Sequence, residues 1–133
     1  MVMGGWAPQA KILTHSSIDG FESHCGWNLI SGSIDYGIPI IAMPMDLDQL
    51  MNAKLLVEIG VALEVERDDN GAFHTEDIAR LIKDVTCGTS GDNLRCNVRN
   101  LGDKLRTKNV EDIDVAVMEL TQLCHKKNKS KNC

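Results

Sequence analysis

The sequence predicts an α/β fold with a doubly wound parallel sheet, and two observations lead to this class. Short apolar runs typical of strands alternate with longer stretches at helical spacing along much of the chain, as in a parallel sheet whose strands are joined by helices. The run at 39–43 is apolar without interruption, as expected of a strand covered on both faces. With 133 residues, of which 43% are hydrophobic, the chain can enclose the core of one domain.

The first half of the chain is expected to supply strands and helices in alternation. Pro39 opens the strongest strand and Pro44 follows it, at positions where a missing N–H does least harm. Gly37 is expected to end the helix before that strand. In order, the expected elements are the end of a strand at 1–6, a short helix at 8–15, a strand at 20–24, a helix at 26–36 and a strand at 39–43. A doubly wound domain usually has more strands before its first ligand loop, so we expect the sheet to be incomplete.

The second half is expected to add one strand and to end in helices. Asp48 is a candidate N-cap for the next helix and Gly60 a stop for it, and Thr75 is a candidate N-cap for a later helix. The expected elements are a helix at 48–59, a strand at 61–65 and helices at 75–85, 92–107 and 111–124, with loops at 68–71 and 88–91. The last helix carries one apolar stripe, formed by Ile113, Val117, Leu120 and Cys124.

Composition limits the possible functions. A net charge of -5 argues against a dedicated nucleic-acid surface. The five cysteines are odd in number and form no CxxC pair, which indicates reduced thiols and a cytoplasmic protein. Neither a signal peptide nor an apolar stretch of about 20 residues is present, so no membrane partner is expected. A basic tail at 126–133 is expected to be solvated and disordered, after a domain at 1–125.

Three loops carry the residues suited to ligand chemistry. Ligands of open α/β sheets bind outside the carboxyl ends of the strands, so these loops should converge. The first loop holds Trp6, which can stack on a base, although a lone Trp is more often part of a core. The second, at 24–28, is a strand-to-helix turn whose amides and His24 suit phosphate, although many helices begin this way without a ligand. In the third, Asp48 and Gln49 suit sugar hydroxyls, but Asp48 as a simple N-cap is equally consistent.

The three loops in this order form a specific pattern. W-x-P-Q from Trp6, H-x-G-W-N from His24 and a closing D-Q at Asp48 occur within the segment 6–49. This segment resembles the signature box of plant secondary-product UDP-glycosyltransferases, enzymes with two Rossmann-like domains (the GT-B fold). The resemblance extends along nearly the whole chain, which is similar to the C-terminal half of that fold. Residues 42–44 and 122–124 look most like the subgroup that extends sugar chains on glycosylated acceptors.

The resemblance implies a role for each matching residue. Trp6 would stack on uracil, the Ala7 backbone would bond the base edge, and Gln9 would reach the ribose. The diphosphate and the donor sugar would be held by a further set: His24, Gly26 and Asn28 for the diphosphate, and Trp27, Asp48 and Gln49 for the sugar. It also implies an inverting transfer of a hexose, with glucose favoured by Gln49, to a hydroxyl of a small plant metabolite or its glycoside. No metal or other cofactor is implied.

The resemblance places the catalytic base elsewhere. In the family, a His usually paired with an Asp deprotonates the acceptor, and it lies in the N-terminal domain, which this chain does not include. We therefore expect no catalytic residue here and an inactive chain when isolated. The remaining histidines, at 15, 74 and 125, are expected to be ordinary surface or packing residues. A metal site formed by His15, His24 and Cys25 is not expected, because a fourth ligand is lacking.

Several positions depart from the family pattern. Leu29 replaces a Ser, which removes a hydroxyl worth about 1 kcal/mol. Gly32 replaces a Glu that would bind the ribose hydroxyls, a loss of roughly 1.5–3 kcal/mol. Glu22 stands where an apolar strand residue is usual, and Asp19 and Asp46 add charge that would disfavour a diphosphate. The departures leave three hypotheses open: an enzyme part inactive alone, a UDP- or UDP-sugar-binding module without chemistry, and a decayed product without a ligand.

Overall fold

The core of the fold is a parallel sheet of three strands. The computed structural model describes residues 7–130, with side chains described at all of these positions except 47, 116 and 119–130. The strands are β1 (Phe21–Ser23), β2 (Ile40–Ala42) and β3 (Ala62–Glu64), hydrogen-bonded in the order β1-β2-β3. Both neighbouring pairs are parallel, with Glu22, Ile41 and Leu63 in register across the sheet. The predicted parallel α/β class is therefore confirmed, while the expected strand at 1–6 lies outside the described residues.

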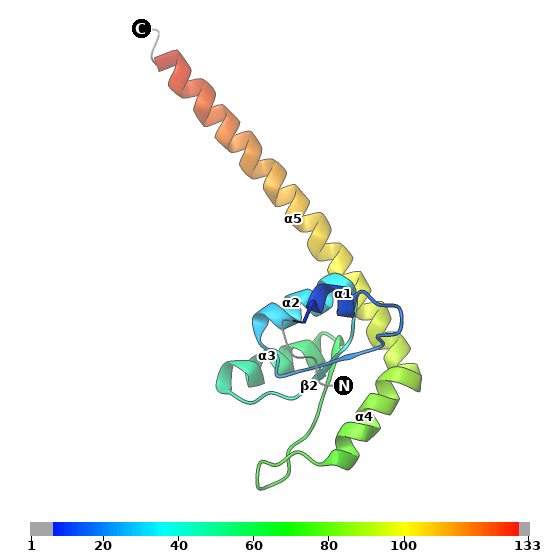
Figure 1. The fold of residues 1–133 in the computed structure, drawn as a ribbon. Coiled ribbons are helices and arrows are strands. Elements are labelled where there is room, and N and C mark those ends of the chain that lie inside the picture. The colour runs from blue at the N-terminus through cyan, green and yellow to red at the C-terminus, as the bar shows by residue number, and fades with distance from the viewer. Residues whose placement is uncertain (1–6, 131–133) are drawn as a thin grey trace. The chain divides into compact units, whose positions relative to one another are not determined.

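Helices connect the strands and follow the last one (Figure 1). Two of them, α2 and α3, are the crossovers of the parallel sheet, as such strands require. The helices are α1 (Gln9–Leu13), α2 (Trp27–Tyr36), α3 (Leu47–Glu58), α4 (Thr75–Cys87) and α5 (Thr89–Ser130). Gly37 and Gly60 both adopt positive φ, of 70° and 76°, just after α2 and α3. Their predicted role as helix stops is confirmed, because this left-handed conformation suits glycine.

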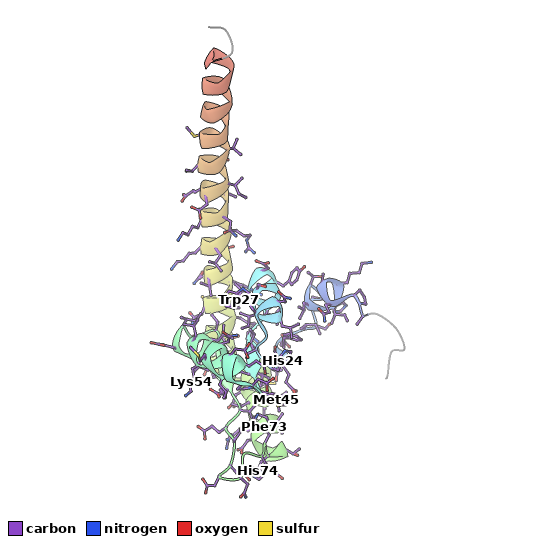
Figure 2. All side chains as sticks on the ribbon, turned by 90° about the vertical axis from the view of Figure 1, so that its left-hand side faces the viewer. His24, Trp27, Met45, Lys54, Phe73 and His74 are labelled. Carbon is purple, nitrogen blue, oxygen red and sulfur yellow. The ribbon has the colours of Figure 1, made fainter. Side chains whose placement is uncertain are left out.

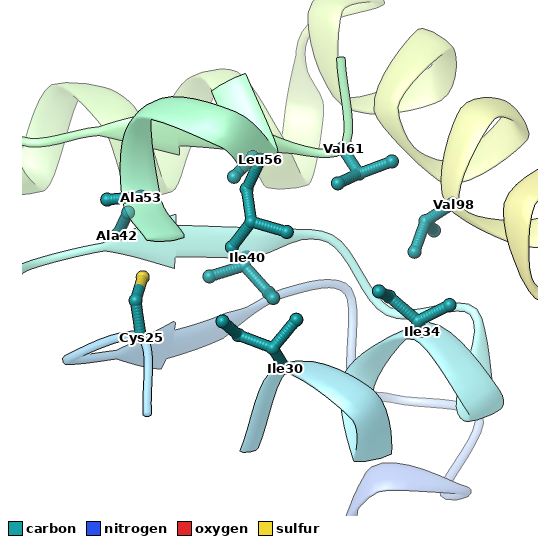
Figure 3. Close-up of a cluster of buried hydrophobic side chains, with 10 residues drawn as sticks. Cys25, Ile30, Ile34, Ile40, Ala42, Ala53, Leu56, Val61 and Val98 are labelled. Carbon is teal, nitrogen blue, oxygen red and sulfur yellow. The ribbon is translucent and has the colours of Figure 1, made fainter. Parts of the chain in front are cut away.

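The middle strand is covered on both faces, as its uninterrupted apolar run predicts. Ile40 and Ala42 point to one face and pack with residues of α2, α3 and α5 (Figure 3). Ile41 points to the other face and packs with Val85 of α4 and Leu94 of α5. All three β2 residues are buried. Alternation along a single strand thus divides the core into two layers.

Two predicted N-caps are wrong by one or two residues. The N-cap of α3 is Asp46 rather than Asp48, and Asp46 has extended backbone with φ −114° and ψ 170°. Gln49 completes the capping box, because its side-chain carbonyl accepts the Asp46 N–H at 3.2 Å. The N-cap of α4 is His74, also extended, so that Thr75 is the first helical residue. The sequence D-x-x-Q from Asp46 is itself a capping pattern, and it accounts for the first correction.

The two helices expected at the C-terminal end form one continuous helix in the structure. The helix α5 runs from Thr89 to Ser130, because residues 108–110 contain neither Gly nor Pro and nothing interrupts the backbone ladder. The expected loop at 88–91 shrinks to Gly88, the C-cap of α4. Residues up to Gly102 form one unit and those from Asp103 a second, and α5 remains helical through positions 126–130. Whether a domain boundary falls at residue 125 stays a prediction.

Candidate functional site

The ligand-binding residues of the prediction follow the carboxyl ends of the strands. Since the strands are parallel and in register, the segments after Ser23, Ala42 and Glu64 leave the sheet at one edge. These segments contain His24, Met45 and Phe73, which Figure 2 labels. The structure thus brings the second and third predicted loops to one edge, as proposed for ligand sites of open α/β sheets. Trp6, from the first loop, lies outside the described residues.

The turn from β1 into α2 has features that suit an anion. The N-cap of α2 is Gly26, with extended backbone and no side-chain cap, so the Trp27 and Asn28 N–H groups are left for a ligand, while the Leu29 N–H donates to the Gly26 carbonyl at 3.0 Å. A Cβ on Gly26 would stand 2.7 Å from Nε2 of His24. The imidazole therefore lies close over Gly26, and a larger residue at this position would require the His24 side chain to shift. His24 and Asn28 are exposed, and Trp27 is 64% exposed.

Cys25 shapes this turn but is not a nucleophile. Its φ of 66° makes it the non-glycine residue with positive φ among the described positions. Two hydrogen bonds hold it: its N–H donates to Ser23 Oγ at 3.0 Å, and its carbonyl accepts from Asn52 Nδ2 at 3.1 Å. Burial, with the charge of Glu64 adding to it, raises the pKa of the Cys25 thiol to about 11. The thiol is therefore neutral at physiological pH, and Cys25 acts as a buried apolar group.

The first turn of α3 presents the acid and the amide. Because Asp46 serves as N-cap, the carboxylate of Asp48 is not used for capping, and it is exposed. The side-chain carbonyl of Gln49 accepts the N–H groups of Met45, at 2.9 Å, and Asp46. This fixes the side chain and leaves its NH₂ group as the donor for a ligand. Of the departures noted in the sequence, Asp46 is explained by its capping role.

Two residues without a predicted role connect the loops. Asn52 of α3 donates to the Cys25 carbonyl and so joins α3 to the phosphate turn. Arg67, just after β3, donates to the Pro44 carbonyl at 2.5 Å and to the Gly71 carbonyl at 2.7 Å. Asn52 lies just after the segment 6–49 and falls in the part of the chain along which the resemblance extends, which was a usable signal. Arg67 had none, since an arginine after a strand is common on protein surfaces.

A cavity of about 350 Å³ lies between α1 and α2. Gln9 and Asn28 line it, so the structure brings these two predicted residues together. Leu29 and Gly32, two of the departures, line the same cavity. A Cβ on Gly32 would meet nothing within 4 Å, so the missing Glu side chain leaves open space. Ala7, at the entrance to α1, already accepts the Gln9 N–H through its carbonyl at 2.9 Å.

The other two departures do not act as the sequence suggests. Glu22 belongs to β1 but is exposed, so its charge is hydrated and the expected penalty for a buried acid does not arise. Asp19 precedes β1, whereas His24 follows it. Five residues of extended chain separate them by roughly 15 Å, so Asp19 lies toward the opposite edge of the sheet and does not repel a diphosphate at His24.

Other titratable clusters are accounted for locally. His74 Nε2 lies 2.9 Å from Asp68 Oδ2, and the Asp68 carboxylate also accepts the Asn70 and Ala72 N–H groups. These bonds hold the pKa of the Asp68 carboxyl below its usual value, and the bond from the Ala72 N–H contributes most. Among the side chains that the structure describes, no group of three or more His, Cys, Asp or Glu is placed to hold a metal ion. The described helices also include none that is long and apolar enough to cross a membrane.

Comparison with known proteins gives a consistent result. The profile of the family described as "UDP-glucoronosyl and UDP-glucosyl transferase" matches residues 1–128. UDP-glucosyltransferase 29 of Panax ginseng is 49% identical over 127 residues, which is 96% of this chain and 29% of that protein. The beta-D-glucosyl crocetin beta-1,6-glucosyltransferase of Gardenia jasminoides is 44% identical over 98% of this chain and 30% of that protein. This chain thus spans about 30% of the length of these relatives.

Solved structures extend the similarity to the fold. Phytolacca americana UGT2, in complex with UDP-2fluoro-glucose and pterostilbene, superimposes with a TM-score of 0.71 at 40% identity, over 74% of this chain and 23% of that one. Os79 of O. sativa, in complex with U2F and trichothecene, gives 0.70 at 35% identity over the same shares. The predicted Rossmann-like α/β fold, as part of a GT-B architecture, is confirmed. The chain therefore belongs to the UDP-glycosyltransferase family and is similar to plant members of it, including a beta-1,6-glucosyltransferase that acts on a glucosyl crocetin.

Proposed function

We propose that this chain is the UDP-sugar-binding part of a plant UDP-glycosyltransferase. The parent reaction transfers a hexose, with glucose favoured, from a UDP-sugar to a hydroxyl of a small metabolite or its glycoside, with inversion at the anomeric carbon. Similarity along 96% of the chain to a UDP-glucosyltransferase supports this proposal. A sugar-chain-extending relative supports a glycoside as acceptor.

The observation that carries the proposal is the construction of the β1–α2 turn. An uncapped helix start, a glycine without steric bulk and an imidazole held over it suit a diphosphate. In the reaction these groups would stabilise the negative charge that develops on the leaving UDP, as preorganised donors do in general. The His24 imidazole is the side-chain donor, and the first-turn amides of α2 are the backbone donors. No divalent metal is needed in this proposal.

The sugar would be held from the adjacent loop. Asp48 accepts hydrogen bonds from sugar hydroxyls and the Gln49 amide donates to them, while the exposed face of Trp27 supplies an apolar surface. The acceptor and the base that deprotonates it would come from a second domain, which follows from the family resemblance. We therefore propose that the chain in isolation binds a donor and transfers nothing. A cytoplasmic location remains part of the proposal.

A binding module without chemistry is the second candidate. Leu29 and Gly32 count against it, because they line the cavity shared with Gln9 and give it an apolar wall where the family has polar groups. The exposure of Glu22, however, removes one of the sequence arguments for a decayed product. The two functional candidates both require UDP binding, and the decayed product does not.

Calorimetric titration with UDP tests the proposal. We expect saturable binding that is lost in Trp6→Ala and weakened about tenfold or more in His24→Ala, since a charge-assisted bond to phosphate is removed. His15→Ala is the matched control, because it removes an imidazole from the loop before β1, at the opposite edge. A folded chain that takes up no heat at millimolar UDP would refute the proposal. Sugar transfer by the pure chain would show that the base has been misplaced.

A further inference from the structure

Arg67 connects the loop after β3 to the loop after β2 through its guanidinium group. Its Nη2 donates to the Pro44 carbonyl at 2.5 Å and lies 3.5 Å from Met45 Sδ. Its Nη1 donates to the Gly71 carbonyl at 2.7 Å. The guanidinium carbon lies 4.1 Å from the centroid of the Phe73 ring, a distance typical of cation–π contact. Figure 2 labels Met45 and Phe73, the contacts on the two loops.

One peptide unit receives bonds on both of its sides. The Pro44 carbonyl accepts from Arg67, and the N–H of the same peptide, that of Met45, donates to Gln49 Oε1 at 2.9 Å. Rotation of this peptide group would break both bonds together. Bonds in series through one peptide also polarise one another. Pro44 is fully buried, which further restricts the segment.

We propose that Arg67 is a positioning residue for the donor sugar, acting through the Pro44–Met45 peptide on Gln49. The guanidinium fixes the peptide, the peptide fixes the Gln49 carbonyl, and the Gln49 NH₂ group is thereby aimed at the ligand. Arg67 itself touches no substrate in this inference. The inference rests on the proposed function for the nature of its ligand, a UDP-hexose, but the peptide arrangement is independent of any ligand.

The position of Arg67 explains why lysine is not equivalent. The planar fork of arginine reaches two carbonyls and also stacks on Phe73, whereas an ammonium group is a single point of charge. Arg67→Lys is therefore expected to retain only part of the positioning effect that Arg67 has on the Pro44–Met45 peptide. Arg80→Gln is a matched control, because it removes the same charge from a surface pair with Asp77 on α4.

Two measurements on the full chain test the inference. The first is hydrogen exchange of the Met45 amide, which reports the peptide without any ligand. We expect protection roughly tenfold lower in Arg67→Gln, intermediate in Arg67→Lys and unchanged in Arg80→Gln. The second is the ratio of the dissociation constants for UDP and UDP-glucose. The sugar gain is the factor by which UDP-glucose binds more tightly than UDP. We expect Arg67→Gln to lower this sugar gain roughly three- to tenfold and to leave the affinity for UDP unchanged.

A double-mutant cycle separates positioning from general stabilisation. If Arg67 acts through Gln49, Arg67→Gln has no further effect on the sugar gain once Gln49→Ala is present. Additive effects, or a sugar gain that survives Arg67→Gln, would overturn the inference even if Met45 exchange changes. If the wild-type chain binds no UDP, the proposed function fails and the role of Arg67 toward the sugar fails with it. The exchange of the Met45 amide then tests the peptide arrangement by itself: reduced protection in Arg67→Gln supports that arrangement, and unchanged protection overturns it.

Discussion

Gly32→Glu is expected to tighten UDP binding, because it restores a carboxylate to the cavity that Gln9 lines. A side chain can be added there without a clash, since a Cβ on Gly32 would meet nothing within 4 Å. Gly32 also lies within α2, where replacing glycine removes a helix penalty of about 1 kcal/mol. The variant should therefore fold at least as well as the wild type. Any change in affinity can then be read as a local effect.

The expected gain is the balance between hydrogen bonds to the ribose and repulsion from the diphosphate. Bonds from two ribose hydroxyls to a carboxylate are worth roughly 1.5–3 kcal/mol. Gly32 is only partly buried, so water competes and the lower end applies. A diphosphate at about 10 Å repels the new charge by about 0.4 kcal/mol per charge pair in water, before salt screening. Asp35, three positions later in the helix, repels the new carboxylate in the free and the bound chain alike, so it lowers helix stability by a few tenths of a kcal/mol and leaves the affinity unchanged. For two phosphate charges the repulsion is about 0.8 kcal/mol before screening and smaller in salt, so the net expectation is an affinity for UDP about threefold to eightfold higher.

Calorimetry with two ligands and three variants isolates the cause. Gly32→Ala raises helix stability without a carboxylate, and Gly32→Gln adds a side chain of the same size without charge. Only Gly32→Glu should show the full gain, and the gain should largely disappear when UDP is replaced by its 2′-deoxy analogue. An equal gain in Gly32→Ala would mean that helix stability, not ribose recognition, is responsible. An unchanged or lower affinity in Gly32→Glu would refute the assignment of this cavity to the ribose.

Three further predictions concern the frame of the site. Gly91→Ala is expected to destabilise the fold by at least about 3 kcal/mol in urea unfolding, because its Cβ would stand 1.9 Å from the Val85 carbonyl oxygen; a loss below about 1 kcal/mol would contradict the close approach of α4 and α5. Cys25→Gly should be more stable than Cys25→Ala by about 1 kcal/mol, the reverse of the usual order, because φ at this position is 66°; equal melting temperatures would count against that conformation. The pKa of Asp68 is lowered chiefly by the Ala72 N–H and also by His74, so its carboxylate should stabilise the fold above the unfolded pKa of about 3.9. That contribution should be lost as the pH falls through the lowered folded pKa. The free energy of unfolding should therefore decline less from pH 7 to pH 2 in Asp68→Asn than in the wild type, and identical pH profiles would disprove this role.

Much of the fold is predictable from the sequence because its strands lie in the interior. A strand buried on both faces needs an uninterrupted apolar run, and 40–42 has one. Gly37 and Gly60 end helices in conformations that other residues adopt only under strain. By contrast, the number of C-terminal helices could not be read from the pattern. Two amphipathic stretches with different apolar stripes are compatible with one continuous helix when no residue between them breaks it.

The residues that carry ligand chemistry could be named from sequence, but not the bonds that hold them. Asp48 and Asp46 both look like caps, and which one caps depends on where the chain leaves the sheet after β2. That exit places Asp46 first and Asp48 inside the first turn. Arg67 is beyond prediction for a related reason. Its partners, Pro44 and Gly71, are separated from it by 23 residues and four residues in sequence, respectively, and only the parallel sheet brings the Pro44 loop beside it.

The departures from the family pattern fall at one end of the site rather than throughout it. Leu29 and Gly32 both line the cavity that Gln9 enters, which is the ribose end in the proposed arrangement. The diphosphate end retains His24 over Gly26 and an uncapped helix. The sugar end retains Gln49, fixed by two backbone N–H groups. A decayed sequence would be expected to lose these arrangements as readily as the ribose contacts, because each depends on one or two side chains. The retained geometry therefore favours a chain that still binds the diphosphate and sugar of its donor, with reduced dependence on the ribose hydroxyls.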